Sequence, residues 1–112
     1  MNWNQAEKLL RSNIYSEMHL SPNANFKIVR EVSPYKCKNY NFGEGFRVQV
    51  GAKNEINVTI EMLKVLFENT RQNNNTYNRA IYKESYPREL NNKPCYVHSV
   101  GKLFEWARVM QL

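Results

Sequence analysis

Aspartate is absent from this sequence of 112 residues, and all ten acidic residues are glutamate. Nucleases and phosphoryl-transfer enzymes that work through two metal ions usually hold Mg²⁺ with aspartate, which places hard oxygen ligands at short reach. The composition therefore disfavours a self-contained enzyme of that class. We favour a non-catalytic protein and expect no cofactor and no metal site.

Cysteine is scarce, since the chain has only Cys37 and Cys95, too few for a disulfide scaffold. We interpret both as reduced thiols. Cys95 and His98 have the i, i+3 spacing that lets a helix offer two metal ligands, or a thiol and a base, on one side. A structural zinc site needs four ligands, and Cys37 and His19 come from distant segments. The sequence therefore predicts no zinc site, and it shows no orienting group for a thiol–imidazole catalyst.

Long apolar runs are also lacking, because no segment approaches the roughly 20 apolar residues that span a bilayer. The first eight residues show no basic region followed by an apolar stretch, which a secretory signal requires. We expect a cytoplasmic protein without membrane contact.

Positive charge is what the sequence has in excess. Sixteen lysines and arginines stand against ten acids, which gives a net charge of +6 and a pI near 9.4. Such a balance favours association with polyanions, although it also serves solubility.

A helix is predicted at the start of the chain. Asn4 followed by Glu7 resembles a capping box, and the apolar residues beyond it recur at helical spacing. This helix is expected to end before Ser21-Pro22.

Apolar and polar residues then alternate along three short segments, as in strands that bury one face. The three segments are residues 26–32, 46–50 and 56–60. The short loop between the second and third segments favours an antiparallel hairpin. The longer connection from Ser33 to Gly45 is expected to extend from the sheet.

Three helices are predicted in the second half of the chain. Thr59 is placed to cap the first, which ends near Asn69. A short helix over residues 78–86 and a last helix over residues 94–110 follow. The predicted fold class is α+β, with an N-terminal helix, a three-stranded antiparallel sheet and three C-terminal helices packed on one face. We expect a single domain spanning residues 1–112.

Lysine, tyrosine and asparagine interleave over residues 35–43. Lysine neutralises phosphate, tyrosine stacks on a base and asparagine bonds a base edge. We predict Lys36 and Lys38 as phosphate contacts and Tyr35 and Tyr40 as stacking side chains of a nucleic-acid site. The alternative is a loop whose aromatic rings cover the edge of the sheet while its lysines stay hydrated.

A second basic segment lies between residues 71 and 93. On the predicted short helix, Arg79, Lys83 and Tyr86 fall at i, i+4 and i+7, so one face presents two cations and a phenol. The alternative is an ordinary hydrated helix face. The phosphate contacts predicted in this segment are Arg71, Arg79, Lys83 and Arg88.

The last helix has two further interpretations. As the second helix of a helix-turn-helix it would enter a major groove, but residues 87–93 exceed the usual turn length and most positions of the helix are apolar. We therefore assign it to the core. Its polar face carries His98, Lys102 and Glu105, which with a tyrosine could serve a small metal-independent ribonuclease.

The order helix, three strands and helix over roughly residues 4–70 resembles that of double-stranded-RNA-binding domains. That family places lysines at the start of its closing helix to meet phosphates. Here the stretch Thr59-Ile60-Glu61-Met62-Leu63-Lys64 holds one lysine and an acid in that turn. The resemblance is topological, and we do not assign the family.

These patterns favour a non-catalytic domain that binds DNA or RNA through the two basic segments. The first alternative is a protein-interaction module, in which seven tyrosines and two tryptophans form a docking surface and the charge steers an acidic protein partner. The ribonuclease is the second alternative. The sequence does not decide the oligomeric state.

Overall fold

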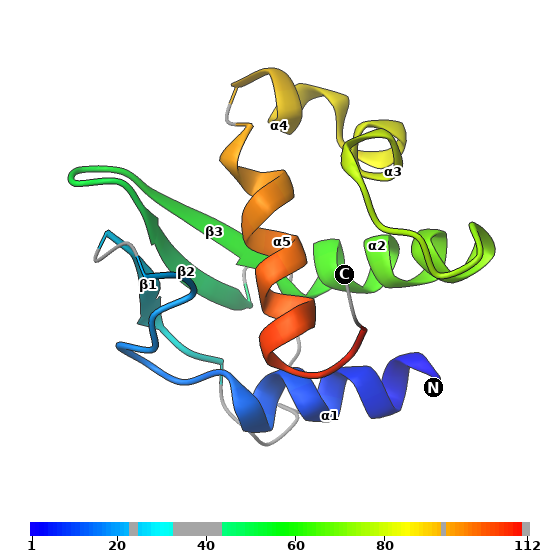
Figure 1. Ribbon diagram of the computed structural model, residues 1–112, viewed down its shortest axis with the longest axis horizontal. Coiled ribbons are helices and arrows are strands. Elements are labelled where there is room, and N and C mark those ends of the chain that lie inside the picture. The colour runs from blue at the N-terminus through cyan, green and yellow to red at the C-terminus, as the bar shows by residue number, and fades with distance from the viewer. Residues whose placement is uncertain (23–24, 33–43, 93, 111–112) are drawn as a thin grey trace.

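A computed structural model describes residues 1–22, 25–32, 44–92 and 94–110. It combines one sheet with five helices (Figure 1), which confirms the predicted α+β class. The elements in chain order are α1 (Trp3–Asn13), β1 (Phe26–Arg30), β2 (Gly45–Val50), β3 (Glu55–Thr59), α2 (Ile60–Gln72), α3 (Arg79–Ser85), α4 (Pro87–Asn92) and α5 (Cys95–Trp106).

Helix α4 is additional to the prediction, because its residues were expected to form a connection. Proline at the first position of a helix costs little, since its missing N–H would have no partner there anyway. Pro87 therefore begins α4 as well as separating it from α3, whose last residue is Ser85.

The three strands form an antiparallel sheet in the order β1-β2-β3, as predicted. Phe46 pairs with Val58 and Val48 with Ile56, and all four side chains are buried. The next residues along β2 and β3 point to the other face, where polar side chains predominate. The sheet thus covers the core with one face.

Gly45 is required where β2 begins, because β3 lies directly against it. A Cβ atom at this position would stand 2.4 Å from the Val58 carbonyl oxygen and 2.6 Å from the Thr59 Cα. Both neighbours are backbone atoms of the paired strand, so they cannot move aside without disturbing the ladder.

The N-cap predicted for α2 is confirmed, whereas the N-cap predicted for α1 is wrong. Thr59 accepts a hydrogen bond from the Met62 N–H, which confirms it as the cap of α2. Helix α1 is capped by Asn2 and not by Asn4, since Asn2 and Gln5 form the reciprocal pair of hydrogen bonds. The prediction of Asn4 was wrong because Glu7 turns inward to bind Arg11.

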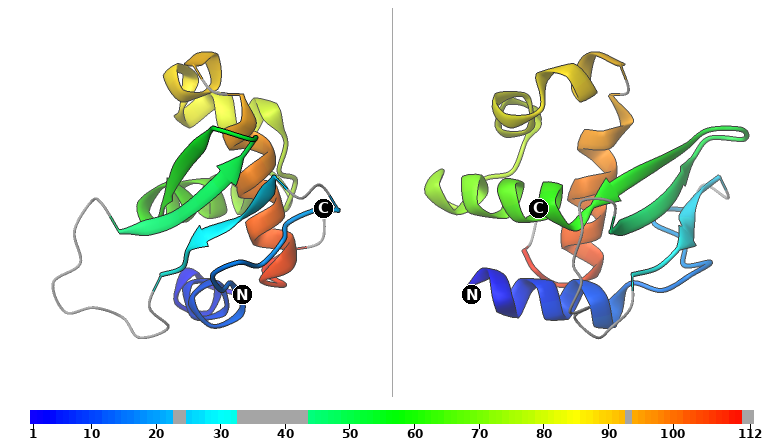
Figure 2. Two further views of the ribbon diagram at one scale, coloured as in Figure 1. Left: turned by 90° about the vertical axis from the view of Figure 1, so that its left-hand side faces the viewer. Right: turned by 180° about the vertical axis from the view of Figure 1, so that it is seen from behind.

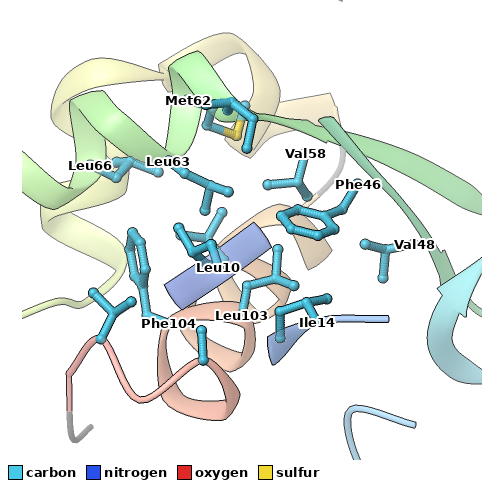
Figure 3. Close-up of a cluster of buried hydrophobic side chains, with 14 of the residues drawn as sticks. Leu10, Ile14, Phe46, Val48, Val58, Met62, Leu63, Leu66, Leu103 and Phe104 are labelled. Atoms are coloured by element: carbon cyan, nitrogen blue, oxygen red, sulfur yellow. The ribbon is translucent and has the colours of Figure 1, made fainter. Parts of the chain in front are cut away.

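The core lies where α1, α2 and α5 meet the sheet. Figure 3 shows apolar side chains from all four converging, with Leu10 from α1, Phe46 from β2, Leu63 from α2 and Phe104 from α5 among them. These side chains are fully buried. The last helix belongs to this core, as its apolar sequence predicted, with Val100, Leu103 and Phe104 inaccessible to solvent.

Helix α5 also separates α1 from the helices α3 and α4. It runs from α4 at one end to α1 at the other (Figure 1), and the view from behind in Figure 2 shows the same arrangement. The helical pair α3 and α4 therefore lies far from α1.

A buried ion-pair cluster joins α1 to the start of β2. Arg11 donates to both carboxylate oxygens of Glu44 at 2.7 and 3.1 Å, and its Nε donates to Glu7 at 3.1 Å. The Arg11 side chain is only 2% exposed. The hydrogen bonds that Arg11 donates to Glu44 are the main cause that raises the pKa of Arg11. Glu44 is held a second time through its carbonyl oxygen, which accepts from the Ile60 N–H at 2.9 Å.

None of the helices in the described ranges has the length and apolar character needed to cross a membrane.

Candidate functional site

The eight predicted contact residues divide into two groups. Tyr35, Lys36, Lys38 and Tyr40 lie outside the described residues, so their prediction stands as made from the sequence. The cations of the second segment are described, and each is exposed. They are Arg71 on α2, Arg79 and Lys83 on α3, and Arg88 on α4.

These four cations sit on helices that pack one after the other. Helix α2 contacts α3, and α3 contacts α4. A side-chain hydrogen bond from Asn69 to Ser85 joins α2 to α3, and the Tyr82 hydroxyl lies 3.9 Å from the Met62 sulfur between the same two helices. The helices that carry the cations are therefore joined by packing and by side-chain contacts.

Four cations outside α2, α3 and α4 are engaged by carboxylates in the described chain. Lys27 binds Glu17, Arg47 binds Glu55, and Lys102 lies 3.7 Å from Glu105. Arg11 is shared by two more carboxylates, as described above. In the described ranges no ion pair involves Arg71, Arg79, Lys83 or Arg88, and the same holds for Lys64, which is also exposed on α2, and for the exposed Lys8, Arg30, Lys53 and Arg108 outside these helices. Exposed cations without carboxylate partners favour a bound anion.

The tyrosines of this segment serve packing. Tyr82 is fully buried, with its ring 5.7 Å from that of Tyr86 and 6.5 Å from that of Tyr96. Tyr86 was expected to share a polar face with Arg79 and Lys83, but it is half-buried against Tyr82. The phenol is thus removed from the predicted contact surface, and the two cations remain on it.

Tyr77 holds the connection between α2 and α3 against α5. Its hydroxyl donates to the Val97 carbonyl oxygen at 2.7 Å, and its ring meets Phe104 edge-on. Burial raises the pKa of this phenol, because it disfavours the charged form. Tyr77 therefore fixes the approach to α3 and is not free to act as an acid or base.

The two basic segments were predicted to meet in one site. The first of them lies outside the described residues, so this prediction stands as made from the sequence. The four helical cations are therefore described as a candidate site of their own.

A pocket of about 480 Å³ opens beside Arg71, at the C-terminal end of α2. The Arg71 guanidinium lies over the Phe67 ring, 5.7 Å from its centroid. The Trp3 ring lies 5.7 Å from the same ring. The i, i+4 spacing of Phe67 and Arg71 is a helical signal for this contact, but the helix was predicted to end near Asn69, whereas α2 continues to Gln72.

The polar face of α5 borders a pocket of about 270 Å³ lined by His98, Lys102, Glu105 and Tyr77, the residue types of the ribonuclease alternative. His98 is exposed and stacks on Phe26 with 5.2 Å between ring centroids, while Lys102 is engaged by Glu105. The nearby Tyr77 is held by its hydrogen bond to Val97. These contacts give each group a structural role.

Cys95 and His98 line a separate pocket of about 240 Å³, together with Ser99. Ser99 is fully buried, and its hydroxyl has no hydrogen-bond partner in the described ranges. No cluster of three or more metal-binding side chains occurs in the part of the chain that the structure describes. Among the described residues that line this pocket, no carboxylate or amide side chain is present to orient His98 as a base for the Cys95 thiol.

Comparison with protein-family models, with curated protein sequences and with solved structures gave no match.

Proposed function

We propose that this chain is a non-catalytic nucleic-acid-binding domain that grips phosphates through Arg71, Arg79, Lys83 and Arg88. The observation that carries the proposal is that four exposed cations, none with an ion pair among the described residues, lie on three helices that contact one another in sequence, α2, α3 and α4. A net charge of +6 adds a favourable field around the whole molecule. Lys36, Lys38, Tyr35 and Tyr40 remain predicted additional contacts.

A phosphate backbone fits this surface better than a protein partner does. An aromatic docking surface needs large exposed rings, and within the described ranges the exposed large apolar side chains are Met1, Tyr15 and Trp106. Trp106 is also fixed by a hydrogen bond from its indole nitrogen to the Leu20 carbonyl oxygen at 2.9 Å. The four exposed cations lie on three consecutive helices that contact one another, whereas these exposed side chains come from separate segments.

The direct test is binding to mixed-sequence single- and double-stranded DNA and RNA at about 50 mM salt and again with added salt. We expect binding below about 100 μM that weakens as salt rises. Absence of binding to all four polymers at low salt would overturn the proposal.

A pair of charge-matched variants locates the site. In the first, the four helical cations are changed to glutamine; in the second, four exposed cations on other elements are changed in the same way, so both lose equal charge. The control positions are Lys8, Arg30, Lys53 and Arg108. We expect the helical variant to lose binding by at least about tenfold more than the control. Equal losses would mean that net charge alone drives association.

Lys36 and Lys38, which lie outside the described residues, need a variant of their own. Changing Lys36 and Lys38 to glutamine is expected to weaken binding relative to the wild type, if the two basic segments contact one polymer. Binding unchanged from the wild type would remove these residues from the site and leave the helical cations as its whole extent.

A further inference from the structure

The pocket beside Arg71 is formed by parts of the chain that are distant in sequence. Phe67 and Arg71 come from α2, Asn75 from the turn after it, and Val109 and Met110 from the segment after α5. Met1 completes the wall. Its volume of about 480 Å³ lies in the range of pockets that bind small molecules, and its lining combines four apolar residues with the polar side chains of Arg71 and Asn75.

Arg71 offers a flat, charged surface to this pocket. Phe67 is 2% exposed and supports the guanidinium from one side, so the opposite side of the guanidinium is the one a ligand meets. A planar guanidinium stacks on aromatic rings and binds phosphate oxygens at its edge. One side chain can therefore recognise both a flat ring and the anionic group attached to it.

Asn75 is held in place by a tight turn at the end of α2. Asn74 and Asn75 have φ values of 58° and 59°, and the Thr76 N–H donates to the Asn73 carbonyl oxygen at 3.1 Å. Positive φ at both central residues is the geometry of a type I′ turn, which asparagine tolerates better than most residues. Asn73 secures the turn by donating from its side chain to the Asn69 carbonyl oxygen at 2.8 Å. The turn presents the exposed Asn75 amide at the pocket.

We infer that this pocket binds an unpaired nucleobase together with its 5′-phosphate. The base stacks on the Arg71 guanidinium between the apolar walls, the Asn75 amide bonds its polar edge, and the arginine contacts the phosphate. This inference rests on the proposed function, and it makes single-stranded nucleic acid the preferred partner. Arg71 would then select unpaired bases, while Arg79, Lys83 and Arg88 contribute sequence-independent charge.

The pocket is tested by itself with mononucleotides. A nucleoside 5′-monophosphate and ribose 5-phosphate are titrated into the whole chain, and the backbone amide signals of Arg71 and Asn75 are followed by NMR. We expect the nucleotide to bind at least about fivefold more tightly than the sugar phosphate, because only the nucleotide has a base to stack. Equal binding, or no shift with the nucleotide at about 5 mM, overturns the pocket.

Two variants separate stacking from charge. Arg71→Lys keeps the positive charge and loses the planar group, so it should weaken nucleotide binding about fivefold or more and leave ribose 5-phosphate unchanged. Asn75→Gly keeps a residue that accepts the positive φ and removes the amide, so it should also weaken nucleotide binding. Arg30→Lys on β1 is the matched control and should change neither ligand. If Arg71→Lys and Arg30→Lys behave alike, the inference is wrong.

Polymer binding distinguishes this failure from failure of the proposed function. An oligonucleotide and an abasic phosphodiester of the same length are compared at equal salt. If the chain binds both equally and ignores mononucleotides, the proposed function stands and the pocket fails. If mononucleotides bind and neither polymer does, the pocket stands and the proposed function fails. Preference for the oligonucleotide, lost in Arg71→Lys, supports both.

Discussion

Replacing Arg11 with methionine is predicted to destabilise the protein strongly. Methionine has a similar length but no charge, so Glu7 and Glu44 would face each other without the cation that now binds both. Their side chains are only 7% and 19% exposed, which leaves little water to replace the lost hydrogen bonds.

The expected cost follows from this burial. Removing one partner of a buried ion pair typically costs about 3–5 kcal/mol, because the other charge stays buried without compensation. Glu44 keeps some contact with water, so we place Arg11→Met at the lower end, about 3 kcal/mol. For a chain of this size, that loss lowers the melting temperature by roughly 13 °C.

A matched control comes from the exposed pair of Arg47 and Glu55. Its atoms are 2.9 Å apart, but both side chains are about 40% exposed. Arg47→Met is therefore expected to cost no more than about 1 kcal/mol. Urea denaturation followed by circular dichroism measures both. Equal losses in the two variants would refute the argument that burial sets the energy of the Arg11 cluster.

Two further predictions concern the strand contact and the buried phenol. Gly45→Ala should lower the free energy of unfolding by at least about 2 kcal/mol in urea denaturation, because its Cβ would collide with the Val58 backbone. Gly51→Ala should be tolerated, because the nearest neighbour of its Cβ would be 3.7 Å away. Equal effects of the two changes would contradict the close packing at Gly45. Burial raises the pKa of Tyr77 above its ordinary value of 10.0, so its contribution to stability is complete below that pH and is lost as the pH rises above it. At pH near 8, Tyr77→Phe should be about 1 kcal/mol less stable than the wild type, because it lacks the hydrogen bond to Val97. As the pH rises from about 8 to 11, however, the variant should lose less stability than the wild type does. An identical pH profile for the two proteins would argue against a buried phenol.

Much of the fold was predictable from local patterns. Alternation along the strands and the cap at Thr59 act within a few residues, and the structure has both where the sequence indicated them. Asn2 and Asn4 each head a plausible capping box, so the choice depended on where Glu7 points. The direction of the Glu7 side chain is set by Arg11 and Glu44, and Glu44 lies 33 residues after Arg11, beyond the reach of a local pattern.

The candidate site was predictable in part, because exposure and charge are local properties while assembly is not. Arg79 and Lys83 are exposed, as their helical spacing suggested. Spacing alone also put Tyr86 with them, and the packing of Tyr82 against Tyr86 and Tyr96 overrides it. The pocket beside Arg71 requires the end of the chain to return to α2, which no local pattern reports.

The most direct test of nucleic-acid binding is the dependence of affinity on salt concentration. Each phosphate neutralised adds about 0.7 to the slope for single strands and about 0.9 for B-form DNA, so contacts from the four helical cations predict a slope of about −3 or steeper. Wild-type affinity should then fall about 100-fold between roughly 50 and 200 mM salt. The variant lacking Arg71, Arg79, Lys83 and Arg88 should lose about three units of that slope, and the charge-matched control should keep it. The same slope in both variants would contradict the account.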